Sequence, residues 1–318
     1  MNRVRLGVVM DPICAIKPWK DTTLAMLLAA QARGWDIEYM EPSWLHARDG
    51  EAFARMQPLS VSDDNHDWFR LQPPRVLPLA ELDIVLMRQD PPVDMEFLYV
   101  TQILELAERA GVLVANRPAA IRTANEKLLA QHYPDLCPPT LVTRDLDQLQ
   151  AFLEEQGEIV VKPLDAMGGA SVFRLGPGDP NARVIFETMT GHGQHTTMAQ
   201  RFEPAVRVGD RRVLLIDGEP IPHALLRVPP EGSFRANLAA GGRGEVVALR
   251  PRDREIAATV GPELAAAGLR FVGLDVIGDS LTEINVTSPT CAREIQAATG
   301  IDIGGQFLDA LRATSHST

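Results

Sequence analysis

The sequence predicts an α/β protein whose N-terminal half builds a largely parallel sheet and whose C-terminal half is α+β with antiparallel hairpins. In the first half, short β-rich apolar runs alternate with amphipathic stretches, an order typical of parallel strands joined by helices. In the second half, neighbouring apolar runs are separated by glycine-rich or Asp-Gly turns, which favour hairpins. A length of 318 residues is enough for about two domains.

In the N-terminal half, strand-like and helix-like periods follow one another in a regular order. Gly34 and Gly111 mark the ends of the two helical stretches, as glycine commonly does. The polar stretch 44–78 contains several prolines and no sustained period, so we expect an insertion there, in the form of a hairpin. The expected strands and helices are 4–10, 36–40, 84–87 and 112–115 for the strands, and 22–33 and 96–110 for the helices.

After Pro138-Pro139 the pattern changes to short paired strands. Asp145 can cap a helix that continues to residue 155. The Asp217-Gly218 pair favours the type I′ turn, whose twist matches that of the flanking strands. The expected hairpins are 159–161 with 171–175 around the turn 165–170, and 211–216 with 221–228 around Asp217-Gly218.

A further hairpin, from strands 271–277 and 282–286, brings oxygen-bearing side chains together. Strand alternation puts Glu283 and Asn285 on one face. If Gly278-Asp279-Ser280 forms the loop, Asp275 lies opposite Glu283, whereas a two-residue turn puts the two carboxylates on opposite faces. We adopt the first register. Two carboxylates and an amide without His or Cys suit Mg²⁺, and the alternative is a solvated outer face of the hairpin.

Lys162 ends an apolar strand, so its ammonium group must reach either solvent or an anion. The turn that follows includes Gly168 and Gly169, whose backbone N–H groups can approach phosphate oxygens closely. The alternative is an ordinary hairpin turn beside a solvated lysine.

The segment 228–243 is rich in proline and glycine and has few large apolar side chains, so it cannot form part of the core. It is either a disordered surface loop or a mobile lid. Arginines gather around it although the protein is acidic, which favours an anion-binding site, while each arginine alone could equally lie on the surface. These arginines are Arg211, Arg212, Arg227, Arg235 and Arg243.

Charged residues also follow two strands of the expected parallel sheet. Arg88 and Asp90 come just after the strand 84–87, and Asp11 comes just after the first strand. Ligands of such sheets usually bind at the carboxyl ends of the strands. We therefore expect these three side chains to face a ligand.

Composition restricts the partners of the protein. The net charge of -11 argues against binding to nucleic acid or to anionic membranes, and no apolar run approaches the roughly 18 residues of a membrane span. The 3 cysteines form no Cys-x-x-Cys pair, and the N-terminal apolar run is short for a signal peptide. We expect a soluble, cytoplasmic protein.

A set of short motifs follows in order along nearly the whole chain: Met10-Asp11-Pro12, Met87-Arg88, Asp90-Pro91-Pro92, Asn125-Glu126-Lys127, Lys162-Pro163-Leu164-Asp165, Met167-Gly168-Gly169, Arg212-Val213-Leu214, Gly241 to Glu245, Gly273 to Gly278, and Thr282 to Thr290. Together they resemble the bacterial glutathione synthetases of the ATP-grasp superfamily. The number and order of the motifs make this resemblance specific.

The resemblance implies an ATP-grasp fold with an N-terminal parallel-sheet domain, and ATP held between two antiparallel sheets. The implied parts are a substrate-binding domain at 1–122, a small lid subdomain at 123–201, and a catalytic subdomain at 202–318 that carries the flexible loop 228–243. Bacterial members are typically homotetramers, so the resemblance implies a homotetramer.

Taken by itself, Lys127 would begin a helix after Asn125-Glu126 and be solvated. The resemblance also implies a role for individual residues, with the adenine near the linker 199–202, where it would contact backbone groups. Mg²⁺ is the implied metal, with Mn²⁺ as an alternative, and ATP is a co-substrate. The implied sets are Lys127, Lys162, Asp165, Gly168, Gly169, Gln200 and Arg201 for ATP; Asp275, Glu283 and Asn285 for metal; Arg212, Arg227 and Arg235 for catalysis; and Asp11, Arg88, Asp90 and Ser288 for substrate.

The implied reaction joins γ-glutamylcysteine to glycine through an acyl phosphate, with release of ADP and phosphate. The nearest alternative is another ATP-grasp ligase, one that resembles D-alanine:D-alanine ligase or that adds glutamate. A second alternative is a catalytically silent nucleotide-binding protein, which the presence of all the charged residues above disfavours. His223 departs from the pattern, because relatives usually carry tyrosine there.

Overall fold

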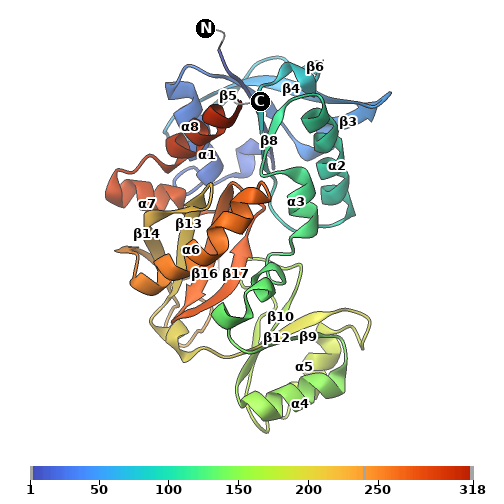
Figure 1. Ribbon diagram of the computed structural model, residues 1–318, viewed down its shortest axis with the longest axis vertical. Helices are drawn as coiled ribbons and strands as arrows, with labels where there is room; N and C mark the ends of the chain where they lie inside the picture. The colour runs from blue at the N-terminus through green and yellow to red at the C-terminus, as the bar shows by residue number, and fades with distance from the viewer. Residues whose placement is uncertain (1–2, 239–240, 316–318) are drawn as a thin grey trace.

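The computed structural model describes residues 3–238 and 241–315, whose strands form three sheets (Figure 1). The first sheet lies in the N-terminal half. Its central strands run in the order β2-β1-β7-β8 and are all parallel. The strands are β1 (Arg5–Met10), β2 (Asp36–Met40), β3 (Leu45–Arg48), β4 (Glu51–Val61), β5 (Phe69–Leu71), β6 (Arg75–Pro78), β7 (Ile84–Arg88) and β8 (Leu113–Ala115).

Helices cover both faces of the first sheet, which is why its central strands read as continuous apolar runs. Along β1, Leu6 and Val8 pack on the side of α1 (Thr22–Ala32), and Val9 packs on the side of α2 (Met95–Arg109). The parallel strands and both helices predicted from the sequence are confirmed. A short helix, α3 (Pro118–Thr123), follows β8.

The stretch 44–78 is more regular than the single expected hairpin. Its strands β3, β5 and β6 pair antiparallel with β4, and β4 in turn pairs antiparallel with β2. Pro58 lies within β4, Pro73 and Pro74 lie between β5 and β6, and Pro78 ends β6. Without a sustained period across these positions, the sequence did not reveal this extension of the sheet.

The second sheet is antiparallel, in the order β11-β10-β12-β9, and has a core of its own. As predicted, Asp145 caps α4, accepting hydrogen bonds from the N–H groups of Asp147 and Gln148. Figure 1 shows this sheet with its two helices at the lower end of the molecule. Its elements are β9 (Thr140–Thr143), α4 (Leu146–Gln156), β10 (Ile159–Pro163), β11 (Phe173–Leu175), α5 (Ala182–Met189) and β12 (Thr197–Arg201).

The third sheet is also antiparallel, in the order β15-β14-β13-β16-β17. Asp217 and Gly218 both have positive φ, 48° and 84°, as a type I′ turn requires, so the predicted hairpin is confirmed. The elements are β13 (Asp210–Ile216), β14 (Glu219–Val228), β15 (Arg243–Ala248), α6 (Pro251–Ala266), β16 (Phe271–Ile277), β17 (Ser280–Asn285), α7 (Ala292–Thr299) and α8 (Ile303–Ser315).

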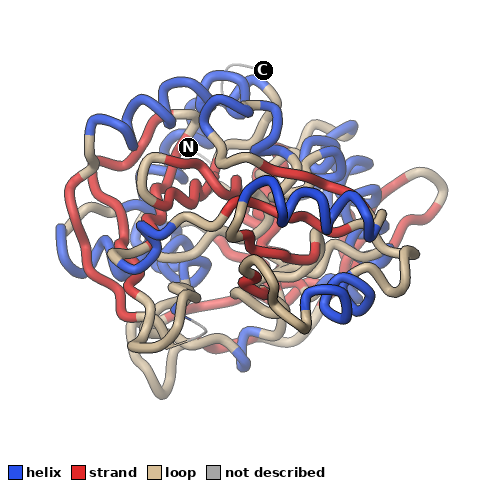
Figure 2. Tube along the Cα trace, turned by 90° about the horizontal axis from the view of Figure 1, so that it is seen from below, coloured by secondary structure: helices blue, strands red, loops and turns tan. Residues whose placement is uncertain are grey.

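The third sheet packs between α6 on one face and α7 with α8 on the other. The last two helices also pack against α1, so the C-terminal end of the chain completes the core of the first sheet. Viewed from below, helices line the upper edge of the molecule, and strands run through its middle and reach its left and right edges (Figure 2). In the described part of the chain, none of the helices has the length and apolar character needed to span a bilayer.

Two local expectations need correction. Residues 199–201 do not form a linker but end strand β12, where their backbone groups are already paired with β9 and β10. Lys127 does not begin an α-helix; it lies in a turn before the short 3-10 helix Leu129–His132.

Candidate active site

Two adjoining cavities lie where the three sheets meet. The first, of about 130 Å³, lies between the second and third sheets. The second, of about 440 Å³, lies between the third sheet and the strand ends of the first. Both cavities are lined by Met167, Gly168, Asn237, Asp275 and Glu283. The two spaces therefore meet at the hairpin β16–β17.

This hairpin has the predicted pairing of Asp275 with Glu283, but it reaches that pairing by a different route. The turn contains only two residues, Gly278 and Asp279, because Ile277 already pairs with Ser280. A β-bulge at Thr282 then adds one residue to β17 and restores the register. The expected three-residue loop is wrong, and the bulge keeps both carboxylates on one face.

Two buried arginines surround Asp275. Nε and Nη2 of Arg212 donate to its two oxygens at 2.6 and 3.1 Å, and Nη2 of Arg227 lies 3.0 Å from Oδ1. Arg227 also donates to Asp210, which precedes Arg212 by two residues on β13. Burial alone would raise the pKa of Asp275, but the two arginines outweigh burial and lower it.

Asp210 has a different electrostatic environment. Burial raises its pKa to about 6 in spite of the nearby Arg227. Its Oδ1 atom is buried and has no hydrogen-bond partner among the described residues. The third sheet thus presents a row of alternating charges, Asp210, Arg227, Asp275 and Arg212, at the junction of the cavities.

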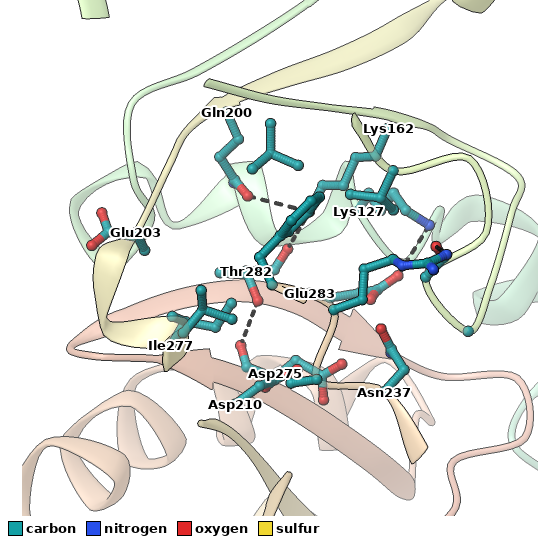
Figure 3. Close-up of a pocket in the computed structure, with 18 of the residues that line it drawn as sticks. Lys127, Lys162, Gln200, Glu203, Asp210, Asn237, Asp275, Ile277, Thr282 and Glu283 are labelled. Carbon is teal, nitrogen blue, oxygen red and sulfur yellow. Dashed lines mark hydrogen bonds and ion pairs between the residues drawn. The ribbon is translucent and has the colours of Figure 1, made fainter. Parts of the chain in front are cut away.

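Two lysines reach the same junction from the other side (Figure 3). Nζ of Lys127 lies 3.1 Å from Oε1 of Glu283 and donates to the carbonyl of Ala166. Nζ of Lys162 donates to Oε1 of Gln200 at 3.2 Å and to the carbonyl of Thr282 at 3.4 Å. Burial lowers the pKa of Lys162. Lys127 is buried rather than solvated, contrary to what its position in the sequence suggests by itself.

The glycine-rich turn and the loop 228–243 meet over the first cavity. Gly168 and Gly169 have positive φ, and the carbonyl of Gly169 accepts a hydrogen bond from Arg235 at 3.4 Å. Phe234 packs edge-on against Phe202, with ring centroids 6.3 Å apart. Residues 239–240 of this loop lie outside the described residues.

Other residues expected at ATP occupy different places around the first cavity. Gln200 is buried and Arg201 is exposed, and both line the cavity. Asp165 is exposed and is not among the lining residues. The positions of Gln200 and Arg201 follow from their neighbouring places on β12.

The second cavity contains three of the four residues expected at the substrate. Oδ2 of Asp11 accepts a hydrogen bond from the N–H of Asp90 at 2.8 Å, which joins the ends of β1 and β7. Burial raises the pKa of Asp90, although the hydroxyl of Ser288 donates to it. Asp11, Asp90 and Ser288 therefore lie together on one wall.

Arg88 does not line this cavity, contrary to expectation. It is the last residue of β7, and its guanidinium group is buried, donating to Thr23 and to the carbonyl of Pro289. Burial lowers its pKa to about 10. The side chain lies behind the wall, where it holds the segment that follows Ser288.

The donor chemistry at the junction fits a hard cation. Asp275, Glu283 and Asn285 supply carboxylate and amide oxygens from one hairpin face, and all three line the second cavity. In the part of the chain that the structure describes, three or more His, Cys, Asp or Glu side chains do not gather as a metal site. The candidate metal ligands are thus two carboxylates and one amide oxygen.

Sequence reasoning missed several residues of the site. Asp210 could have been found, since alternation along β13 puts it on the same face as Arg212. Glu126 could not: its Oε1 accepts from the N–H groups of Val286 and Thr287 and fixes the end of β17, 160 residues away. Burial, followed by the charge of Glu283, raises the pKa of Glu126.

Comparison with known proteins identifies the family. Residues 4–122 match the N-terminal domain of prokaryotic glutathione synthetase, and residues 126–300 match its ATP-grasp domain. The chain belongs to the prokaryotic glutathione synthetases. Members of this family are ligases. The glutathione synthetase of Pseudomonas aeruginosa is 56% identical over 310 residues, 98% of each chain, and that of Vibrio cholerae is 51% identical over 315 residues, 99% of each.

Solved structures show the ATP-grasp fold that was predicted for this glutathione synthetase family member. D-cycloserine synthetase DcsG has a TM-score of 0.67 at 16% identity, with 98% of this chain and 99% of that chain covered. D-alanyl-alanine synthetase A from Vibrio cholerae has a TM-score of 0.61 at 13% identity, with 99% of each covered. At such low identity, these likenesses establish the fold alone.

Proposed function

We propose that this chain joins γ-glutamylcysteine to glycine to form glutathione, consuming ATP and releasing ADP and phosphate. The observation that carries the proposal is the meeting of two cavities at Asp275 and Glu283. A nucleotide in the first cavity would have its terminal phosphate beside an acceptor carboxylate in the second. Membership of the glutathione synthetase family supports these substrates.

The chemistry follows from the low reactivity of a carboxylate. An oxygen of the cysteinyl carboxylate attacks the γ-phosphorus of ATP, the bond to ADP breaks, and an acyl phosphate forms. The glycine amine then attacks the acyl carbon, phosphate leaves with the C–O bond electrons, and the amine loses its proton. Both steps depend mainly on alignment and on neutralising charge.

On the nucleotide side, we assign Lys127 and Lys162 to the phosphates, because their ammonium groups converge on the junction, Lys162 from β10 and Lys127 from the turn before Leu129. Gly168 and Gly169 would cover the phosphates with backbone N–H groups. Gln200 and Arg201 would lie at the adenine end. Asp165, which does not line the cavity, would act only by shaping the turn.

We assign Asp275, Glu283 and Asn285 to Mg²⁺, with Mn²⁺ as an alternative. When bound, the metal would neutralise phosphate charge. Arg212 and Arg227 already neutralise the carboxylate of Asp275. The charges at the junction therefore compensate one another before ATP binds. Both arginines also line the second cavity, where they would stabilise the transferring phosphoryl group. Arg235 would help hold the loop 228–243 over the nucleotide.

On the acceptor side, Asp11, Asp90 and Ser288 would contact the dipeptide. Arg88 would act through the backbone of Pro289, since its side chain is held behind the wall. It is therefore a positioning residue rather than one that binds substrate directly.

The test is ADP release with Mg²⁺ and ATP in the presence of γ-glutamylcysteine, with and without glycine, combined with mass detection of the tripeptide. We expect glutathione and ADP in equal amounts and only when glycine is added. ATP binding without turnover on these substrates would overturn the proposal and favour another ATP-grasp ligase.

We also propose a division into the parts 1–122, 123–201 and 202–318, and a cytoplasmic homotetramer. The family match, with its two parts, supports the first boundary. Light scattering coupled to size-exclusion chromatography would test the tetramer, and a mass of one or two chains of 34.8 kDa would contradict it.

A further inference from the structure

Two of the proposed metal ligands, Glu283 and Asn285, lie on an outer strand. β17 is the last strand of the third sheet and pairs with β16 along one edge. An outer strand usually leaves the N–H and C=O groups of its other edge to solvent, and such edges open more easily than central strands. A strand that holds two ligands in a fixed geometry therefore needs support along its outer edge.

Glu126 gives this support in the place of a neighbouring strand. Its backbone carbonyl accepts a hydrogen bond from the N–H of Ile284 at 2.9 Å. Its Oε1 atom accepts from the N–H groups of Val286 and Thr287 at 2.8 and 3.0 Å, and from the hydroxyl of Thr287 at 2.8 Å. A single residue thus binds the backbone on both sides of Asn285.

The amide ligand itself is oriented from the inner edge of β17. Nδ2 of Asn285 donates to the carbonyl of Gly273 on β16 at 3.1 Å. Because the amino nitrogen is held in this way, the amide oxygen is the atom that can face a cation. A shift of the outer edge would change the distance between this oxygen and the carboxylate of Glu283.

The residues on either side of Glu126 reach the nucleotide side of the junction. Nζ of Lys127 lies 3.1 Å from Oε1 of Glu283 (Figure 3). Nδ2 of Asn125 donates to the carbonyl of Leu164, just before the glycine-rich turn, at 3.0 Å. Three consecutive residues therefore connect this turn, a phosphate-binding lysine and the strand that carries the metal ligands.

We propose that Glu126 is a positioning residue for the metal. It acts through the backbone of β17 and fixes Glu283 and Asn285 relative to Lys127, so that metal and nucleotide strengthen each other's binding. This inference rests on the proposed function, which places Mg²⁺ and ATP at the junction. Removing a residue that holds metal ligands in place commonly lowers metal affinity by about 10- to 100-fold.

The test separates the reach of the side chain from its charge. Glu126→Gln keeps the length and an oxygen that can accept from Val286 and Thr287, but it removes the charge. Glu126→Asp keeps the charge, but it withdraws the carboxylate from β17 by one methylene group. Calorimetry gives the Kd for ADP of each protein with excess Mg²⁺ and with EDTA, and the ratio of the two values is the gain in affinity due to the metal.

We expect Glu126→Asp to lower this gain about 10-fold and Glu126→Gln to retain most of it. The Kd in EDTA should change little in either variant, because Lys127, Lys162 and the glycine-rich turn remain. Glu154→Asp is the matched control, since Glu154 is an exposed residue of α4 that lines neither cavity, and both of its Kd values should equal those of the wild-type protein.

The opposite pattern, in which Glu126→Gln loses the gain and Glu126→Asp retains it, would overturn the inference, because charge and not position would then matter. An equal rise of Kd with and without Mg²⁺ would also overturn it, since the residue would then support only the fold of the nucleotide site. Glu126→Ala should behave like Glu126→Asp, and it keeps the test available if the shorter acid does not fold.

The same measurements distinguish this inference from the proposed reaction. ADP binding does not depend on which acceptor the enzyme uses. A wild-type protein that forms no glutathione but binds ADP more tightly with Mg²⁺ would refute the proposed substrates alone. A wild-type protein without any gain from Mg²⁺ would overturn the positioning role of Glu126.

Discussion

At Arg227, two buried carboxylates share a single guanidinium group. Asp210 and Asp275 both pair with it, and only Asp275 has a second arginine, Arg212. An arginine held in this way is costly to remove, because its loss leaves buried negative charge without compensation. The same rigid pairing places the guanidinium at the cavity junction before any substrate arrives.

The substitution Arg227→Met should therefore affect stability and rate separately. We expect a loss of about 3 to 5 kcal/mol in the free energy of unfolding, and a decrease in kcat of about 100- to 1000-fold, comparable to removing a donor to a developing charge. Urea unfolding and steady-state kinetics measure the two effects. Adding Asp210→Asn should recover part of the stability and none of the rate; recovery of the rate would show that Arg227 is only structural.

Asp210 should also impose a pH dependence on stability. Its pKa is raised from 3.8 to about 6, chiefly by burial. Between about pH 4 and pH 6 the folded protein binds a proton at Asp210 that the unfolded chain has released, so falling pH favours the folded state through this residue. Relative to Asp210→Asn, the wild-type protein should gain free energy of unfolding from pH 7 to pH 5. A difference that stays constant with pH would contradict this.

At the scale of elements, local chemistry in the sequence predicted the hairpin 211–228, the cap at Asp145 and the parallel strands. It could not predict the bulge at Thr282, because a bulge and a three-residue loop give the same pairing of Asp275 with Glu283. It also missed strand β15, which pairs with β14 across the long loop 229–242 without a tight turn to mark the pairing. It missed Glu126 as well, because the partners of that side chain are far away in sequence.

The loop 228–243 gives a prediction at this scale. A Cβ at Gly242 would lie 2.2 Å from the carbonyl oxygen of Ala236, so Gly242→Ala should open the turn that brings Asn237 to the cavities. Water would then reach the acyl phosphate, and we expect more ATP hydrolysed per glutathione formed, with little change in stability.

The matched control for this loop is Gly232→Ala. Gly232 has positive φ but open space around its Cβ position, so the substitution strains the backbone without a clash. It should keep ADP and glutathione in equal amounts. If both variants remain fully coupled, the loop does not protect the intermediate.

At the scale of the whole molecule, the distribution of apolar cores determines which parts unfold together. Phe307 of α8 is buried against Phe271 of β16, with ring centroids 5.0 Å apart, in a core that also includes β1 and α1. Phe186 of α5 is equally buried, but in a separate core formed by the second sheet with α4 and α5. The first and third sheets thus share a core, and the second sheet stands apart.

The matched substitutions Phe307→Ala and Phe186→Ala should therefore destabilise different parts of the molecule. Each removes a buried ring and should cost about 3 to 5 kcal/mol locally. We expect Phe307→Ala to speed amide hydrogen exchange across the first and third sheets together, because they share its core. Phe186→Ala should speed exchange mainly in the second sheet and weaken ATP binding, since that sheet forms one wall of the first cavity. Equal effects of both variants on all three sheets would show instead that the chain unfolds as one cooperative unit.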